Sequence, residues 1–248
     1  DFTSQINNDP GSIILALNNA KPPLNDVRVR NALALAFDQK KYIQASYKNT
    51  APYVENWFGN SQEFSNTGYL HHNIKKAKEL IEAYGKSVEL EFVHSPTSRG
   101  RTGGLIVQQM MKEIGVKVTP VPMDFSGIIK HMFSGQFDMA SWAFVGGYDP
   151  GPQTVANLHS RSPWNVCKYS SGKMDNLLVQ QRTSTDPVAR AKIFNTIVQT
   201  ANSETPFIYL NGIRSYLFSR NNVKNIKPLV PGQSGSMARN LFDIWLDK

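Results

Sequence analysis

The sequence predicts an α/β fold in which helices cover a mixed or parallel sheet. Three observations favour this class. Strand-like segments, which are apolar runs or stretches of alternating polarity, alternate along the chain with segments whose apolar residues have helical spacing. The order strand, helix, strand, helix, strand from residue 88 to 145 is typical of βαβ units. At 248 residues, 40% of them hydrophobic, the chain is long enough for one large domain or two small ones.

The first elements are predicted from an apolar run and two helix caps. Residues 13–17 form a short apolar run expected to be a buried strand, and residues 18–23, rich in Asn and Pro, cannot extend it. The Asn25-Asp26 pair offers an N-cap, and the apolar spacing after it predicts one helix running through Ile43. A second helix is predicted from Asn73, ending at Gly85.

The centre of the chain repeats the strand-helix alternation. A half-buried strand is expected over residues 88–92, followed by a helix with Leu105, Met110 and Ile114 facing inward. A strand then starts at Val116. Asp124 caps the next helix, in which the pair Phe133 and Phe137 around its end is assigned to the core, and residues 137–145 form an apolar strand.

The last part of the chain has a different pattern. Asp186-Pro187 is a cap with Pro at the first helical position, so a helix is expected through about Ala201. Two short β-like pieces, residues 207–210 and 215–218, then follow, separated by turn-forming residues.

Composition narrows the function classes. The chain has 27 Lys and Arg against 19 Asp and Glu, a formal net charge of +8, but the basic residues are scattered, so no nucleic-acid partner is expected. The single Cys167 excludes an intrachain disulfide. His71 and His72 are adjacent and cannot face one metal as an i, i+4 pair would, so neither a metal nor a cofactor is expected.

The stretch from Trp142 to Gln153 carries the first functional signal, because an apolar strand runs directly into a loop rich in Gly and Pro. Ligands of open α/β sheets bind at the carboxyl ends of strands, where such loops leave the sheet. The Gly146-Gly147 pair would let the backbone approach a ligand, Tyr148 could stack on it, and Asp149 could accept from a cation. Alternatively, Asp149 only caps its own turn, and the residues alone leave both readings open.

Short motifs spread along the chain resemble a known family. They are PPLNDVRVRNAL at residues 22–33, KKAKELI at 75–81, IGVKV at 114–118, SGQFD at 134–138, TDP at 185–187 and TPFIYL at 205–210. Their order and spacing resemble the extracytoplasmic solute-binding proteins of the dipeptide, oligopeptide and nickel class, which serve ABC importers.

The resemblance implies a domain organisation. Residues 22–204 would be a complete C-terminal lobe of the periplasmic binding protein type II kind, a mixed sheet flanked by helices. Residues 1–21 would be a remnant of a first lobe with the first interlobe crossing, and residues 205–248 the return crossing with strands of that first lobe. The chain is therefore expected to be the C-terminal portion of a longer family member.

The resemblance also implies a function without bond chemistry. Such a protein is the substrate-binding component of an ABC importer, which closes two lobes over a peptide or peptide-like solute and delivers it to the membrane permease. It is not an enzyme, and it works in the periplasm or anchored at the cell surface. Strand edges and faces that belong against the other lobe would make an isolated portion prone to self-association.

Two loops would line the cleft, and they supply the predicted ligand-binding residues. In peptide-binding members an Asp in the loop after the strand Trp anchors the α-ammonium of the peptide, whereas this chain has glycine near that place, and Asp149 matches the DP that closes the loop. The stretch of the family's carboxylate-binding arginine holds His94 and Ser95, with two arginines nearby. The predicted residues are His94, Arg99, Arg101, Trp142, Phe144, Val145, Gly146, Gly147, Tyr148 and Asp149.

Two other classes remain as alternatives. A serine hydrolase-like enzyme could use Ser170, which is in Ser-x-x-Lys spacing with Lys173, or a cysteine nucleophile at Cys167, with His159 as the nearest histidine. A protein-interaction module is the other alternative, because a separated lobe would expose apolar faces that tend to find partners.

Overall fold

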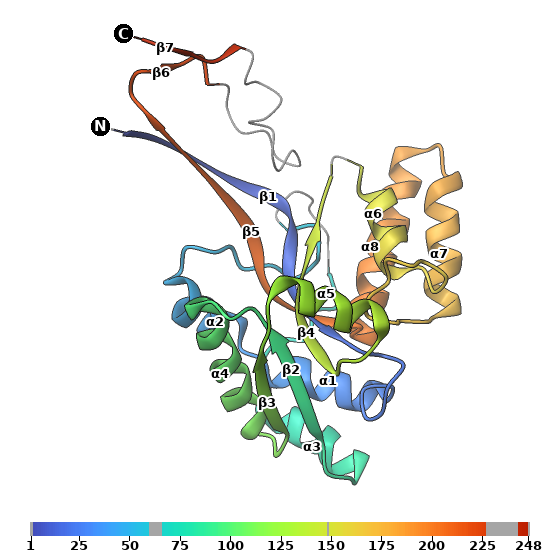
Figure 1. Ribbon diagram of the computed structural model, residues 1–248. Coiled ribbons are helices and arrows are strands. Elements are labelled where there is room, and N and C mark those ends of the chain that lie inside the picture. Colours follow the sequence, from blue (N-terminus) through green and yellow to red (C-terminus); the bar gives the residue numbers. More distant parts are fainter. Residues whose placement is uncertain (1, 60–65, 148, 227–242, 248) are drawn as a thin grey trace.

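A five-stranded mixed sheet forms the centre of the molecule in the computed structural model, which describes residues 2–59, 66–147, 149–226 and 243–247. The strand order is β3-β2-β4-β1-β5. β2 pairs in parallel with β3 and β4, whereas β1 pairs antiparallel with β4 and β5 (Figure 1). The strands are β1 (Phe2–Leu17), β2 (Glu89–His94), β3 (Lys117–Pro122), β4 (Met139–Val145) and β5 (Phe207–Arg220), with β6 (Val223–Lys224) and β7 (Trp245–Leu246) in a separate pair. The predicted α/β class is therefore confirmed.

Helices cover both faces of the sheet (Figure 1). Because side chains alternate along a strand, β1 sends Leu15 and Leu17 into one core and Ile14 and Ala16 into the other. None of the helices in the described ranges is long and apolar enough to cross a bilayer. The first core lies under α1 (Val27–Ala36), α2 (Gln39–Tyr47), α3 (Ile74–Tyr84) and α4 (Ser98–Lys112), and the second under α5 (Phe125–Ser134), α6 (Pro150–Leu158), α7 (Gly172–Thr183) and α8 (Pro187–Glu204).

Side-chain caps set the starts of all eight of these helices. Each begins after a polar residue in extended conformation whose side-chain oxygen accepts a bond from a backbone N–H two or three positions ahead. The caps are Asp26, Asp38, Asn73, Thr97, Asp124, Asp149, Ser171 and Asp186.

Several sequence predictions need correction at element boundaries. The helix predicted through Ile43 is two helices, because Phe37 is extended and Asp38 caps a new start. Helices α6 and α7 were not predicted, since the loop-like Gly and Pro residues and a polar stretch hide their short apolar faces. The two β pieces after residue 206 are one continuous strand, β5, and β1 extends back to Phe2.

Two predicted core residues are also exposed. Leu105 has 62% of its surface exposed, because α4 packs instead through Gly103, Gly104 and Val107. Phe133 is 36% exposed, and its ring meets Trp142 and Trp164 edge-on at the surface side of α5.

Polar side chains tie together the places where β1 ends and β5 begins. The amide of Asn18 donates to the carbonyls of Gly135 and Phe137, at 3.0 and 2.9 Å. The amide of Asn19 donates to the carbonyls of Cys167 and Pro206, both at 3.1 Å. The Asn-Asn pair that ends the first strand therefore also holds the neighbouring loops together.

A buried arginine completes this junction. Arg30, only 7% exposed, donates to the carbonyl oxygens of Leu24, Glu204 and Thr205 over 2.6 to 3.0 Å. Burial lowers the pKa of Arg30, while nearby Tyr169 and Glu204 oppose that change. The start of α1 is thus fixed to the end of α8.

A bulge divides β1 into two parts. From Gly11 to Leu17 it pairs with β4, and from Ser12 to Ala16 it also pairs with β5, where the register shifts between Asp9 and Ser12. Before the bulge, residues 2–9 pair with residues 213–220 of β5 in a two-stranded arm, the β1–β5 ribbon, which extends away from the helices (Figure 1). The strands that the prediction assigned to another lobe thus also belong to the central sheet, over residues 11–17 and 207–212.

Gly11 makes the bulge possible. Its φ of +125° is a conformation that side-chain-bearing residues rarely adopt, and a Cβ atom there would lie 2.3 Å from the carbonyl oxygen of Phe144. Beside Gly11, the N–H of Gly146 donates to the carbonyl of Pro10 at 2.9 Å. The backbones of β1 and of the loop after β4 therefore touch at this point.

Candidate functional site

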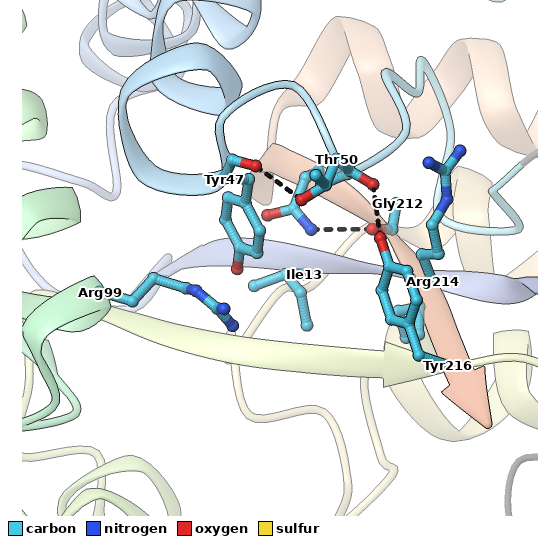
Figure 2. Close-up of a pocket in the computed structure, with 10 residues that line it drawn as sticks. Ile13, Tyr47, Thr50, Arg99, Gly212, Arg214 and Tyr216 are labelled. Carbon is cyan, nitrogen blue, oxygen red and sulfur yellow. Dashed lines mark hydrogen bonds between the residues drawn. The ribbon is translucent and has the colours of Figure 1, made fainter. Parts of the chain in front are cut away.

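A pocket of about 280 Å³ lies where the β1–β5 ribbon leaves the sheet (Figure 2). One wall comes from the end of α2 and the start of α4, and the other comes from β1 and β5. The lining residues are Ile13, Tyr47, Thr50, Ala51, Arg99, Asn211, Gly212, Ile213, Arg214 and Tyr216. Arg99 is the one predicted binding residue among them.

Arg99 is held in place by an aromatic ring. It lies in the first turn of α4, and its guanidinium carbon is 4.7 Å from the centre of the Tyr47 ring (Figure 2). Burial raises the pKa of Tyr47, although Arg99 and Asn211 act to lower it, so the phenol stays neutral at pH 7. Arg99 makes no ion pair with any carboxylate of the described residues.

Asn211 contributes a buried amide to the same pocket. The residue is 2% exposed, and its Nδ2 donates to the carbonyl of Gly212 at 2.8 Å. Because the Gly212 carbonyl can only accept, the amide atom that bonds to it is the nitrogen, and the remaining amide atom is the oxygen, Oδ1. No group of the described residues donates to this Oδ1 atom.

A hydrogen bond connects the two walls of the pocket, and another fixes the end of α2. The hydroxyl of Tyr216 donates to the carbonyl of Thr50 at 3.3 Å, and the hydroxyl of Thr50 donates to the carbonyl of Tyr47 at 2.6 Å (Figure 2). The end of α2 is therefore attached to the ribbon at Tyr216, and the pocket depends on the position of both.

The loop after β4 forms a different site. Asp149 caps α6 by accepting from the N–H of Gly151 at 2.9 Å, and it accepts from the guanidinium of Arg190 on α8 at 2.7 Å. Partial burial raises the pKa of Asp149, but the bonds from Gly151 and Arg190 outweigh it, so the pKa is lowered. A second pocket of about 440 Å³ is lined by Asp149, Gly151, Pro152, Val155, Gln181, Arg182 and Arg190.

We expect Asp149→Ala to lower the free energy of unfolding by about 1 kcal/mol, the usual cost of a lost helix cap. Asp149→Asn is the matched control, because its amide oxygen can still accept from Gly151 and only the Arg190 ion pair is lost. The carboxylate contributes fully above its unfolded pKa of 3.8, and that contribution disappears as the pH falls through the lower folded pKa. Urea unfolding at pH 7 and pH 3 measures both effects; equal stability of the Ala variant and the wild type at pH 7 would contradict them.

Three other predicted residues face the interior of the molecule. His94 is 2% exposed; its Nδ1 lies 2.8 Å from the carbonyl oxygen of Ser95, and its ring packs against Gly104, where a Cβ would be 2.8 Å from Nε2. Phe144 is buried with its ring edge-on to Phe207. Trp142 packs on the second core beside α5. In the described structure these three side chains therefore make packing contacts inside the molecule.

The remaining predicted residues lie at the surface. Arg101 is exposed, and its Nε donates to the carbonyl of Pro96 at 3.2 Å. Val145 is 45% exposed, and a Cβ added at Gly147 would meet only the carbonyl oxygen of Asp149, at 3.9 Å. Tyr148 lies outside the described residues. The structure thus places Arg99 and Asp149 in separate pockets, and the assignment of these residues to ligand binding stays a prediction.

Sequence reasoning missed most of the pocket around Arg99. Tyr47 and Thr50 lie at the end of a helix, and Arg214 and Tyr216 lie on a strand, where each residue type is ordinary. The sequence held one signal, the polar Asn211 directly after the apolar run 207–210. The structure shows that this residue is buried in β5. A buried amide in a strand usually has a specific partner.

The geometry gives no support to the hydrolase alternative. Cys167 is fully buried, and this burial raises the pKa of its thiol to about 12, so a thiolate nucleophile does not form at neutral pH. Ser170 and Lys173 share no hydrogen bond in the part of the chain that the structure describes. The neighbouring Ser171 is the cap of α7.

Comparison with known proteins shows the class of this protein. Residues 3–165 match the family described as bacterial extracellular solute-binding proteins, family 5, middle region. The chain belongs to this family, as its motifs predicted.

Particular relatives agree with this assignment. The chain is 25% identical over 239 residues to the periplasmic oligopeptide-binding protein OppA of Escherichia coli, covering 88% of this chain and 41% of OppA. It is 23% identical to the nickel-binding periplasmic protein of the same organism, covering 93% of this chain and 48% of that protein. The chain therefore spans less than half the length of these curated relatives.

Solved structures share the fold. DppA of Helicobacter pylori in complex with peptide STSA matches with a TM-score of 0.86 and 21% identity, covering 100% of this chain and 49% of that one. AppA of Bacillus subtilis in complex with a nonapeptide matches with a TM-score of 0.85 and 17% identity, covering 100% of this chain and 53% of that one. These likenesses confirm the predicted binding-protein fold.

Proposed function

We propose that this chain is part of the substrate-binding component of an ABC importer, which captures a peptide or peptide-like solute between two lobes and delivers it to the permease outside the cytoplasm. The observation that carries the proposal is the pocket around Arg99, which is lined jointly by helices of the lobe and by the start of the β1–β5 ribbon. A pocket built at such a junction changes when the lobe moves relative to the ribbon, as binding by closure requires.

The same feature supports a domain organisation. We propose that residues 22–204 form the lobe, and that the ribbon leads to a second lobe of the kind present in the longer relatives. The loop after β4, including Asp149 and the exposed Val145, would face the cleft beside the Pro10–Gly11 bulge.

The solute class that we favour is a peptide. Solved structures with a similar fold include a complex with a peptide and a complex with nickel and histidine. Within the described ranges no group of three or more His, Cys, Asp or Glu side chains could hold a metal ion. The pocket instead offers a guanidinium and an amide oxygen, which suit the polar groups of a peptide.

The function is tested by isolating the protein at its natural length without removing bound solutes. Mass spectrometry of the small molecules released on denaturation should identify peptides, and isothermal titration should then show saturable, micromolar or tighter binding of the same peptides. A protein that releases none, and binds none from a peptide library, would refute the proposal. Hydrolysis of the added peptides would also refute it, since a binding component returns its solute unchanged.

We propose further that the ribbon is an interface. Residues directly opposite in an antiparallel pair share a face, which here gathers Phe2, Ile6, Tyr216 and Phe218. These side chains are 44% to 69% exposed, and the rings of Tyr216 and Phe218 stack with centres 6.3 Å apart. The ribbon of this chain therefore presents an apolar face that favours association.

We expect the 248-residue chain alone to self-associate, with Phe218→Ser weakening the association about tenfold or more. Sedimentation velocity over a hundredfold range of concentration measures the effect. Val188→Ser is the matched control, because Val188 is 64% exposed on α8, away from the ribbon. A wild-type chain that stays monomeric throughout, or equal weakening by both variants, would show that the ribbon is not the interface.

A further inference from the structure

The pocket beside Asp149 holds more positive than negative charge. It has a volume of about 440 Å³ between α6, α7 and α8, and it shares no residue with the pocket around Arg99. Two arginines, Arg182 and Arg190, line it together with one carboxylate, Asp149, so the lining carries a net charge of +1. An anionic group bound there would balance this charge.

Arg190 is the arginine that Asp149 neutralises. Its Nη2 donates to Oδ1 of Asp149 at 2.7 Å, and its guanidinium carbon lies 5.2 Å from the centre of the Phe194 ring. The same Oδ1 accepts from the N–H of Gly151 at 2.9 Å. These contacts fix the ion pair, and the net charge of the pocket is therefore that of the other arginine.

Arg182 is this other arginine, and it is exposed in the last turn of α7. It makes no ion pair with any carboxylate in the part of the chain that the structure describes. Its guanidinium can therefore turn to a ligand in the pocket without breaking a salt bridge. A planar group with several N–H donors matches a carboxylate in particular.

Gln181 adds a buried donor to the same pocket. The residue is 0% exposed, and its Oε1 accepts from Nη2 of Arg190 at 3.1 Å. Because a guanidinium can only donate, the remaining amide atom is the nitrogen, Nε2, and no group of the described residues accepts from it. A buried donor is costly to leave without an acceptor, so a ligand that supplies one is favoured.

The polar groups of the pocket converge at Gly151. A Cβ atom on this residue would lie 2.6 Å from Nη2 of Arg190, 2.9 Å from Oε1 of Gln181 and 3.2 Å from Oδ1 of Asp149. The unsatisfied amide nitrogen of Gln181 belongs to the same group as this Oε1 atom. The donor and the charged groups therefore occupy one place between the three helices.

We propose that α6, α7 and α8 form a binding site for a carboxylate carried by a short aliphatic chain. The carboxylate pairs with Arg182 and accepts from Nε2 of Gln181, while the aliphatic part packs on Pro152 and Val155. The site is separate from the solute pocket and does not depend on which solute the protein carries. The carboxylate can come from a free short-chain acid or from a Glu side chain of a partner protein.

Valine-methyl NMR of the protein at its natural length tests the site, because Val155 lines the pocket and Val179 on α7 does not. Butyrate represents the free acid. A tripeptide with a central Glu and both ends blocked, whose only charge is the side-chain carboxylate, represents the partner protein. At least one of these probes should shift the Val155 methyl signals, leave those of Val179 in place and saturate with a Kd of about 1 mM or tighter.

The relative affinities of the two probes identify the source of the carboxylate. If the blocked tripeptide binds about tenfold more tightly, the natural ligand is a side chain of a partner protein, because the flanking peptide groups then contribute to binding. If butyrate binds as tightly or more tightly, the natural ligand is a free acid.

Gln181→Glu should weaken binding of the tighter probe about tenfold or more, because the new carboxylate still accepts from Arg190 but replaces the donor with a negative charge. Gln180→Glu is the matched control, since it makes the same charge change at an exposed neighbour outside the pocket. Arg182→Gln should also weaken binding about tenfold, whereas Lys173→Gln, at the other end of α7, should not.

Two results would overturn the site. One is the absence of a saturable shift of the Val155 signals with either probe. The other is an Arg182→Gln protein that binds the tighter probe as well as the wild type does; because Arg182 is exposed, this variant should fold even if Gln181→Glu does not, and its melting temperature checks this. Neither result bears on the release and binding of peptides, so the proposed function would stand.

Discussion

Gly11→Ala should lower the free energy of unfolding by roughly 2 to 6 kcal/mol, the sum of a backbone-strain term and an overpacking term of about 1 to 3 kcal/mol each. The added Cβ would lie 2.3 Å from the carbonyl oxygen of Phe144 and 3.0 Å from the amide nitrogen of Gly146. Both are backbone atoms of neighbouring chain segments, so no flexible side chain can move aside. The register between β1 and β4 would have to shift to admit the methyl group.

Urea unfolding followed by tryptophan fluorescence measures this loss. Gly172→Ala is the control, since Gly172 opens α7 and a Cβ there meets no atom within 4 Å. It should change stability little or raise it slightly, because alanine restricts the unfolded chain. If Gly11→Ala is within about 1 kcal/mol of the wild type, the tight contact at the bulge is not what the structure indicates.

Arg30→Met should lower the free energy of unfolding by about 3 to 5 kcal/mol, because it leaves three carbonyl groups without their hydrogen-bond donor. Each buried carbonyl left without a donor costs about 1 to 3 kcal/mol, and water that reaches some of them reduces the total. These are the carbonyls of Leu24, Glu204 and Thr205. Methionine fills a similar volume, so the change isolates the lost hydrogen bonds. The junction between α1 and α8 should also loosen, which hydrogen exchange at the start of β5 would detect.

Arg28→Met, two positions earlier on the same helix, is the matched control. Arg28 is an exposed partner of Asp26, and surface ion pairs of this kind contribute little. Its denaturation midpoint should stay close to that of the wild type. Equal losses from the two substitutions would mean that helix propensity, and not the buried bonds of Arg30, causes the effect.

The parts of the fold that sequence reasoning predicted are those set by local chemistry. Asn73 and Asp124 correctly predicted helix starts, and Gly85 a helix end, because capping residues act within a few positions of the helix boundary. The family motifs identified the fold, since several short matches in the right order are specific. The break at Asp38 was missed because the apolar spacing continues across it.

The candidate site could be predicted only in part, because it depends on contacts between distant residues. Arg99 was named because the family resemblance placed the loop after residues 92–93 at the cleft, but Tyr47 and Asn211, which line the same pocket, lie about 50 residues before it and more than 100 after it. His94 was expected at the cleft, but it is buried because Gly104 leaves room for its ring. Nothing in the sequence near His94 indicates this contact. Loop sequence indicates where a strand ends, whereas side-chain direction depends on packing across the sheet.

The bulge in β1 also places the two ends of a long stretch of chain next to each other. The chain passes between ribbon and lobe at two places that lie side by side, since Asp9 pairs with Ile213 and Ser12 with Gly212. Everything between these points, including α2 and α4 with their pocket residues, is therefore one continuous segment whose two ends lie on paired residues of β1 and β5. Natural or engineered exchange at this place would replace the wall that carries Tyr47 and Arg99 and leave the ribbon unchanged.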